Sequence, residues 1–194
     1  FRSGIRGIRD DLCVSDGLAE LLENENEVLL VILVLSVGRW TAAGILPVDV
    51  HAHKTGLIEN GAARLGLPNI TARQQDATQC VPEWIDAMDV VIADVPCSGL
   101  GIIRKKPDIR YKNLKEMEEL PALQLQILSN QANYVKPGGV LMYSTCTVLR
   151  RENEDVVKAF LEERDDFYAE PLTLPEVFPK NETGMLTLIP GQFD

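Results

Sequence analysis

This chain lacks both the clustered metal ligands of a zinc protein and the long apolar segment of a membrane protein. Its four cysteines are scattered, no Cys-x-x-Cys pair occurs, and neither histidine lies near a cysteine. The longest apolar run, residues 28–35, is too short to span a bilayer, and the N-terminus has no apolar signal segment. We therefore expect no metal, no membrane association, and reduced thiols in a cytoplasmic protein rather than disulfides.

The chain also lacks the excess of basic residues that is typical of a general nucleic-acid-binding surface. Its 194 residues carry a net charge of −10, and 45% of them are hydrophobic. One segment departs from this acidic average, because residues 101–115 hold six basic residues and a single acid, Asp108. Such a run is usually a solvated loop, but here it follows a candidate site loop and can contact phosphate. We expect a single, monomeric domain over residues 1–194, with an atypical N-terminal segment at 1–45.

Apolar runs alternate with amphipathic segments along most of the chain. This alternation predicts an α/β fold with a doubly wound, mainly parallel sheet. Gly66 is expected to end one helix, and residues 136–139 are expected to form a turn, while Pro121 marks a break or a new first turn. The expected strands are 27–37, 45–50, 69–75, 90–95, 140–145, 167–169 and 186–189, and the expected helices are 16–26, 52–65, 114–134 and 152–163.

Two cysteines lie in loops that directly follow expected strands. Cys97 lies in Asp-Val-Pro-Cys-Ser-Gly-Leu-Gly at residues 94–101, and Cys146 lies in Tyr-Ser-Thr-Cys-Thr at residues 143–147. Ligands of open α/β sheets bind at the carboxyl ends of the strands, and small polar residues around both thiols leave room for one. This placement indicates covalent chemistry at Cys97 and Cys146, whereas Cys80 is interpreted as a buried core thiol.

Two acids also stand at expected strand ends. A carboxylate at Asp49 can accept hydrogen bonds from both hydroxyls of a ribose, although Asp49 can equally cap the following helix. Asp76 can accept a hydrogen bond from an adenine amino group, although position alone favours a simple turn residue. The residues themselves leave these alternatives open.

The two cysteine loops resemble those of the NOL1/NOP2/Sun family of RNA cytosine-5 methyltransferases, with the bacterial Sun (Fmu) type most similar. The resemblance rests on residues 94–99 with Gly-Ile-Ile-Arg-Lys-Lys-Pro-Asp-Ile-Arg at 101–110, and on residues 143–147 with Glu-Asn-Glu at 152–154. It covers roughly residues 46–160, and residues 184–191 resemble the family's ending. It implies the Rossmann-like fold of S-adenosylmethionine-dependent methyltransferases, and we expect the catalytic domain alone.

The resemblance also implies a role for each candidate residue. Cys146 would add to C6 of a cytosine in RNA, most naturally small-subunit ribosomal RNA, and so make C5 nucleophilic. Asp94 would bind the cytosine N3/N4 edge, and Cys97 would assist release after methyl transfer from S-adenosyl-L-methionine. Asp49, Asp76 and Asp94 would contact that cofactor. The implied contacts to RNA come from the basic segment, at Arg104, Lys105, Lys106 and Arg110.

One segment departs from the family pattern and motivates alternatives. The family's first cofactor loop is proline- and glycine-rich, but here Asp11-Leu12-Cys13 is followed by Val14 to Leu18 without the proline, the glycine pair or the lysine. A non-catalytic RNA-binding or assembly domain that has lost its cofactor loop is therefore a second hypothesis. A DNA cytosine methyltransferase with Cys97 as nucleophile is a third, and the Cys146 loop speaks against it.

Overall fold

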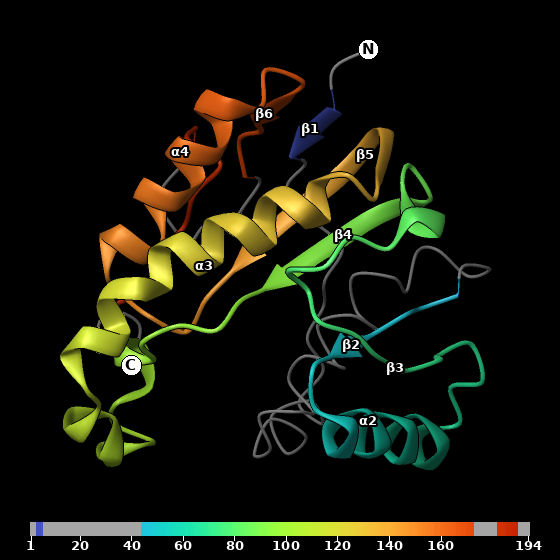
Figure 1. Cartoon of the computed structure of the whole chain (residues 1–194), viewed down its shortest axis with the longest axis horizontal. Helices are drawn as coiled ribbons and strands as arrows, with labels where there is room; N and C mark the ends of the chain where they lie inside the picture. The colour runs from blue at the N-terminus through green and yellow to red at the C-terminus, as the bar shows by residue number, and fades with distance from the viewer. Residues whose placement is uncertain (1–2, 6–43, 173–181, 190–194) are drawn as a thin grey trace. The chain divides into compact units, whose positions relative to one another are not determined.

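Short parallel strands and the helices that cover them make up the described part of the chain (Figure 1). The computed structural model describes residues 3–5, 44–172 and 182–189. It divides into two units, one formed by Phe1–Gly7 with Cys80–Asp194 and the other by Ile8–Gln79. The expected helix at 16–26 and strand at 27–37 lie outside the described residues.

The smaller unit pairs β2 (Val48–Asp49) with β3 (Arg73–Gln74) in parallel and places α2 (Ala52–Leu65) between them in the chain. The ladder extends beyond β2, because the carbonyls of Ile45, Pro47 and Asp49 accept backbone N–H groups two residues apart on the other strand. Pro47 takes part only as an acceptor, since it has no N–H to donate. Gly66 ends α2 in the left-handed conformation (φ 67°), as the sequence predicted.

The larger unit is built on β4 (Met88–Asp94) and β5 (Val135–Ser144), which run parallel. Met88 lies opposite Val135 but Val90 lies opposite Val140, so β5 has a bulge where the sequence predicted a turn at 136–139. Gly138 has φ 82° within this bulge, a conformation that favours glycine. A second parallel pair joins β1 (Ser3–Ile5) to β6 (Phe167–Ala169).

Two helices pack against the larger unit's strands and against each other. They are α3 (Leu114–Ala132), which contacts β4 and β5, and α4 (Glu154–Glu163), which lies against α3 (Figure 1). Pro121 lies inside α3, which continues through it rather than breaking. The described part of this unit also contains four 3-10 turns: η3 (Pro82–Trp84), η4 (Leu100–Ile102), η5 (Pro107–Tyr111) and η6 (Arg150–Glu152).

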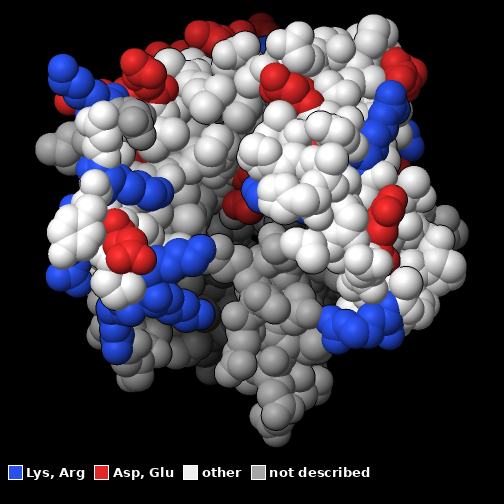
Figure 2. Space-filling view, turned by 60° about the horizontal axis from the view of Figure 1, so that its bottom comes forward, with Lys and Arg blue, Asp and Glu red and all other residues white. Residues whose placement is uncertain are grey.

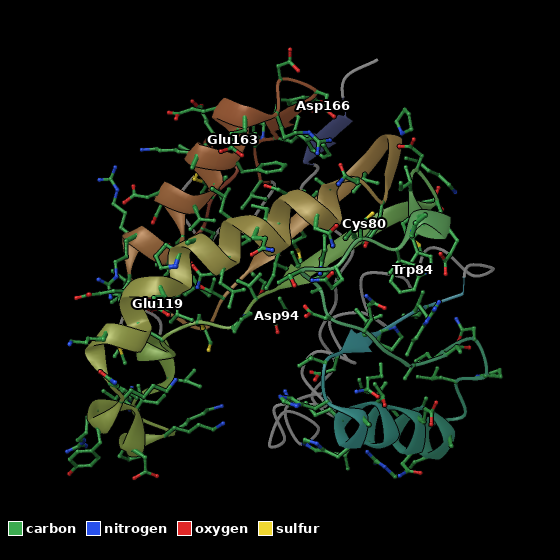
Figure 3. The ribbon with its side chains drawn as sticks, viewed as in Figure 1. Cys80, Trp84, Asp94, Glu119, Glu163 and Asp166 are labelled. Atoms are coloured by element: carbon green, nitrogen blue, oxygen red, sulfur yellow. The ribbon has the colours of Figure 1, made fainter. Side chains whose placement is uncertain are left out.

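The core of the larger unit is apolar and contains edge-to-face aromatic pairs. Ala93, Leu141 and Phe160 are completely buried between the strands and the helices. Phe160 packs on Phe167 with ring centroids 5.3 Å apart, and Trp84 packs on Tyr134 at 5.6 Å. Trp84 is therefore a packing residue, and it lies shortly before the start of β4, whereas Asp94 lies at the other end of that strand (Figure 3).

The remaining expectations have mixed outcomes. The strands at 90–95 and 167–169 and the helices at 114–134 and 152–163 are present, with bounds shifted by a few residues. The strand expected at 186–189 is wrong, because these residues are described without strand pairing. Within the described segments, no helix combines the length and apolar character that crossing a membrane requires.

Candidate active site

Both cysteine loops begin at the same edge of the β4–β5 pair. The parallel register sets Asp94 opposite Ser144, the last residues of the two strands. The Val95 N–H donates to the Ser144 carbonyl at 3.1 Å, and Ser144 Oγ lies 3.1 Å from Asp94 Oδ1. The carboxylate of Asp94 lies at this end of β4 (Figure 3). The next residues of each strand therefore enter the same region, as expected for a ligand crevice.

The structure brings the two sulfurs into direct contact. Cys97 Sγ lies 3.1 Å from Cys146 Sγ, and the Cys146 N–H points to Cys97 Sγ at 3.3 Å. Both thiols are free, with Cys97 partly exposed and Cys146 exposed. The pair is thus reachable from solvent and joined by a hydrogen bond, which is suitable for a shared reaction centre.

The contact between the two sulfurs shifts the pKa values of the two thiols in opposite directions. The hydrogen bond from Cys146 lowers the pKa of Cys97 to about 7, although burial opposes this shift. The same hydrogen bond raises the pKa of Cys146, and burial raises it further. Burial also raises the pKa of the Asp94 carboxyl, against the hydrogen bond from Ser144. In the absence of substrate, the first negative charge of the pair therefore resides on Cys97.

A fully buried carboxylate, Glu152, holds the Cys97 loop. Glu152 Oε2 accepts the Ser98 N–H at 2.8 Å and the Gln124 side-chain amide at 3.1 Å. The Gln124 amide also donates to the Pro96 carbonyl at 2.9 Å, so α3 reaches the same loop. Ser98 and Gln124 are themselves completely buried. Buried polar groups need such partners, and this network therefore fixes the backbone on both sides of Cys97.

The next residue, Asn153, holds the Cys146 loop. Its side-chain amide donates to the Thr147 carbonyl at 3.0 Å, and its Oδ1 accepts from Thr145 Oγ1 at 2.5 Å. Thr147 Oγ1 lies 2.7 Å from Ser98 Oγ, which links the two loops through buried hydroxyls. Sequence reasoning missed these roles of Glu152, Gln124 and Asn153. The only signal was the Glu-Asn-Glu motif at 152–154.

Glycines allow the loops to approach each other closely. The Gly101 N–H donates to the Cys146 carbonyl at 3.0 Å, and a Cβ added at Gly101 would lie only 2.8 Å from that oxygen. Gly99 has φ 76°, and a Cβ there would meet Ile109 Cδ1 at 3.1 Å. Gly101 is therefore needed for the observed contact between the loops, and Gly99 for the left-handed conformation beside Ile109.

The basic segment follows the Cys97 loop directly. Figure 2 shows Lys and Arg side chains gathered on one side of the molecule, over the η4–η5 segment. Lys112 Nζ donates to the Ser98 carbonyl at 3.0 Å, which ties this segment to the loop. The four expected RNA contacts lie here with exposed side chains: Arg104, Lys105, Lys106 and Arg110.

The two remaining acids stand at the carboxyl ends of β2 and β3 in the smaller unit. Asp49 Oδ1 accepts the His51 N–H at 2.8 Å, and Oδ2 accepts from Lys54 Nζ at 3.2 Å. Asp76 Oδ1 accepts both the N–H and the hydroxyl of Thr78, which lowers the Asp76 pKa. Asp76 therefore acts as a turn residue, and Oδ1 accepts both hydrogen bonds from Thr78. Residues 11–18 lie outside the described residues.

Comparison with known proteins places the chain in a family. Residues 33–194 match the family model described as 16S rRNA methyltransferase RsmB/F. The chain belongs to this family. "Probable ribosomal RNA small subunit methyltransferase B" of Bacillus subtilis is 37% identical over 94% of this chain. The chain spans 40% of that protein's length.

Solved structures confirm the expected α/β Rossmann-like fold of this methyltransferase family. The structure titled "Crystal Structure of PH0851" has a TM-score of 0.64 and 31% identity, covering 68% of this chain and 30% of that one. NSun6 from Pyrococcus horikoshii, solved with SFG, has a TM-score of 0.55 and 25% identity, covering 71% of this chain and 34% of that one. The resemblance that the sequence analysis stated is thus confirmed at the level of the family and the fold.

One expectation about the cysteines is wrong. Cys80 is exposed rather than buried in the core, because it lies just before η3, at the surface of the larger unit. Among the described residues, no group of three His, Cys, Asp or Glu side chains is placed to hold a metal ion. Of the three cysteines that the structure describes, Cys97 and Cys146 are the two in contact.

Proposed function

We propose that this chain transfers a methyl group from S-adenosyl-L-methionine to C5 of a cytosine in small-subunit ribosomal RNA, as a monomeric cytoplasmic enzyme. The observation that carries the proposal is the 3.1 Å contact between Cys97 Sγ and Cys146 Sγ at the strand end that also carries Asp94. The family supports the reaction class, since its model is described as a 16S rRNA methyltransferase. The B. subtilis relative carries a ribosomal RNA small subunit methyltransferase name, which supports the substrate.

The residues of the smaller unit fit the cofactor. Asp49 and Asp76 end neighbouring parallel strands, where their carboxylates would accept from the ribose hydroxyls and the adenine amino group. A carboxylate has about four lone-pair sites, so the contacts of Asp49 to His51 and Lys54 leave acceptor capacity. When bound, S-adenosyl-L-methionine supplies an electrophilic methyl group for C5.

The sulfur pair supplies the nucleophile. Cys97, with a pKa of about 7, is the thiolate of the pair and accepts the hydrogen bond from the Cys146 thiol. Transfer of that proton to Cys97 Sγ leaves a thiolate on Cys146, which forms a bond from Sγ to C6 of the cytosine. The electron pair of the C5–C6 bond moves toward C5, which becomes nucleophilic. The target base must leave any stack to reach the pair.

Asp94 stabilises the charge that develops on the base. Burial raises its pKa, so it is protonated more readily than an exposed aspartate and can donate to cytosine N3. In its ionised form it accepts from the N4 amino group. Either hydrogen bond fixes the ring above the sulfur pair and identifies cytosine by its N3/N4 edge.

Cys97 completes the reaction. Once Cys146 Sγ is bonded to C6, the Cys97 thiol returns the proton received from Cys146 to solvent and becomes a thiolate again. It then takes the proton from C5 as the bond from C6 to Cys146 Sγ breaks and the electrons restore the aromatic ring. The methyl group now on C5 would leave the cofactor as S-adenosyl-L-homocysteine, so the products are RNA methylated at C5, that thioether, the Cys146 thiolate and the Cys97 thiol that holds the former C5 proton.

Three cysteine variants of the full chain test this proposal. Cys146→Ser should abolish transfer of labelled methyl groups to 16S rRNA, whereas Cys97→Ala should accumulate a covalent protein–RNA adduct that survives denaturing gels. Cys80→Ser is the matched control, because it removes an exposed thiol outside both loops. Unchanged methyl transfer in Cys146→Ser would overturn the mechanism.

Residues 14–18 lack the proline, the glycine pair and the lysine of the family's first cofactor loop. A non-catalytic RNA-binding domain is therefore a second candidate function. Calorimetry with S-adenosyl-L-methionine separates the two, since cofactor binding that Asp49→Asn weakens supports the enzyme. RNA binding without cofactor binding supports the alternative. Methylation of a DNA oligonucleotide in preference to RNA would instead favour a DNA methyltransferase.

A further inference from the structure

An aromatic side chain at the end of η5, the turn that follows the Cys97 loop in the chain, is almost fully exposed. Tyr111 is 80% exposed, more than any other large apolar or aromatic side chain in the described residues. The tyrosine next in exposure is Tyr168 on β6, at 43%. A ring this exposed contributes little to packing.

The backbone around Tyr111 is fixed to the Cys97 loop on both sides. Ile109, two residues before it, is buried, with its Cδ1 packed against Gly99. Lys112, immediately after it, donates from Nζ to the Ser98 carbonyl at 3.0 Å. Tyr111 thus projects from a turn that is anchored to the same loop that carries Cys97. Its neighbours are tied to that loop, while its own ring is open to solvent.

The charges around Tyr111 suit a polyanion. Six exposed basic residues surround it in the sequence: Arg104, Lys105, Lys106, Arg110, Lys112 and Lys115. The exposed acids Asp108, Glu118 and Glu119 border this group, so the attraction is local. Proteins that bind single-stranded nucleic acid combine such basic residues with aromatic rings on which bases stack.

We propose that Tyr111 is a stacking platform for an RNA base next to the target cytosine. This inference rests on the proposed function, because it assumes that RNA reaches the cysteine pair. When the target base leaves its stack, its neighbours lose a stacking partner. The exposed ring of Tyr111 replaces that partner, while the basic side chains contact the phosphates. The ligand is a single-stranded or locally unpaired RNA segment.

Binding of a fluorescent single-stranded RNA oligonucleotide carrying the target sequence tests the proposal. Tyr111→Ala should weaken binding roughly 5- to 150-fold, the range for loss of one stacked base. Tyr111→Phe should bind within about twofold of wild type, because it keeps the ring. Tyr168→Ala is the matched control and should bind like wild type.

Salt dependence separates stacking from a general effect on the surface. Tyr111→Ala should leave the slope of log affinity against log salt unchanged, whereas Lys105→Ala should reduce it by about 1. An abasic nucleotide beside the target should weaken wild-type binding and remove the difference between Tyr111→Ala and wild type.

Several results would overturn the inference. They are equal binding by Tyr111→Ala and Tyr168→Ala, a loss in Tyr111→Phe as large as in Tyr111→Ala, or an altered salt slope in Tyr111→Ala. Methyl transfer by wild type is measured in parallel. If wild type transfers methyl groups and Tyr111→Ala binds RNA as tightly as wild type, only this inference is wrong. A Tyr111-dependent affinity without methyl transfer defeats only the proposed function, and absence of any RNA binding defeats both.

Discussion

The two cysteine loops leave neighbouring strands at the same edge, yet they are held in different ways. The Cys97 loop is fixed by completely buried side chains from two other segments, Gln124 in α3 and Glu152 in η6. The Cys146 loop is more exposed and is held by Asn153 and by the backbone of Gly101. The consecutive residues Glu152 and Asn153 thus each serve one loop.

This difference fits the different tasks that we propose for the two thiols. Cys97 moves protons and carries the lower pKa, which requires a fixed hydrogen-bonded position. Cys146 forms and breaks a bond to the base, which requires access and some freedom to move away from Cys97. A rigid loop and an adaptable loop placed face to face provide both.

The largest expected effect comes from removing the buried carboxylate. Glu152→Ala leaves the buried Ser98 N–H without an acceptor and removes one of two acceptors from Gln124. We expect the free energy of unfolding to fall by about 2–4 kcal/mol, because an unsatisfied buried polar group costs about 1–3 kcal/mol. Urea unfolding of the purified chain measures it.

Asn153→Ala is the matched variant for the other loop. Its hydrogen bonds to the Thr147 carbonyl and to Thr145 Oγ1 are only partly buried, so water can replace the lost amide. We expect a smaller loss of about 1 kcal/mol. A larger loss in Asn153→Ala than in Glu152→Ala would show that the Cys146 loop, and not the Cys97 loop, is the more firmly held of the two.

The second largest effect tests the contact between the loops. Gly101→Ala places a Cβ 2.8 Å from the Cys146 carbonyl oxygen, a backbone atom that cannot turn aside. We expect a loss of about 1–3 kcal/mol, as for other overpacked sites. The loops should also separate, which lowers the yield of cross-linking between Cys97 and Cys146 by a short thiol-reactive linker. Unchanged cross-linking would contradict the observed approach.

The third effect concerns the acidity of the pair. In Cys146→Ala the hydrogen bond that chiefly lowers the Cys97 pKa is lost, so this pKa should rise from about 7 toward the ordinary thiol value. The thiolate fraction at pH 7 then falls, and alkylation of Cys97 by iodoacetamide should slow by roughly 3- to 10-fold. In Cys97→Ala the pKa of Cys146 should fall instead. Identical pH profiles in the two variants would refute the asymmetry.

The sequence predicted the positions of the cysteines and the acids at strand ends, because a local pattern determines where a strand stops. It could not predict the role of Gln124, which lies in the middle of α3 and reaches the Cys97 loop only through tertiary packing. It also placed a strand at 186–189, where apolar residues occur without a pairing partner among the described strands. Local patterns thus locate the reactive groups, whereas the groups that hold them depend on contacts distant in sequence.

The smallest expected effect has the opposite sign and comes from a glycine outside the cysteine loops. Gly56 lies inside α2, and an added Cβ would meet nothing within 4 Å. Gly56→Ala should therefore stabilise the chain by about 0.5–1 kcal/mol, since alanine favours a helix interior more than glycine does. Thermal unfolding of Gly56→Ala and Gly101→Ala side by side provides the measurement. A higher melting temperature in Gly56→Ala and a lower one in Gly101→Ala would show that the loss at Gly101 comes from the close approach of the two loops. A lower melting temperature in both variants would indicate a general cost of replacing glycine and would contradict this explanation.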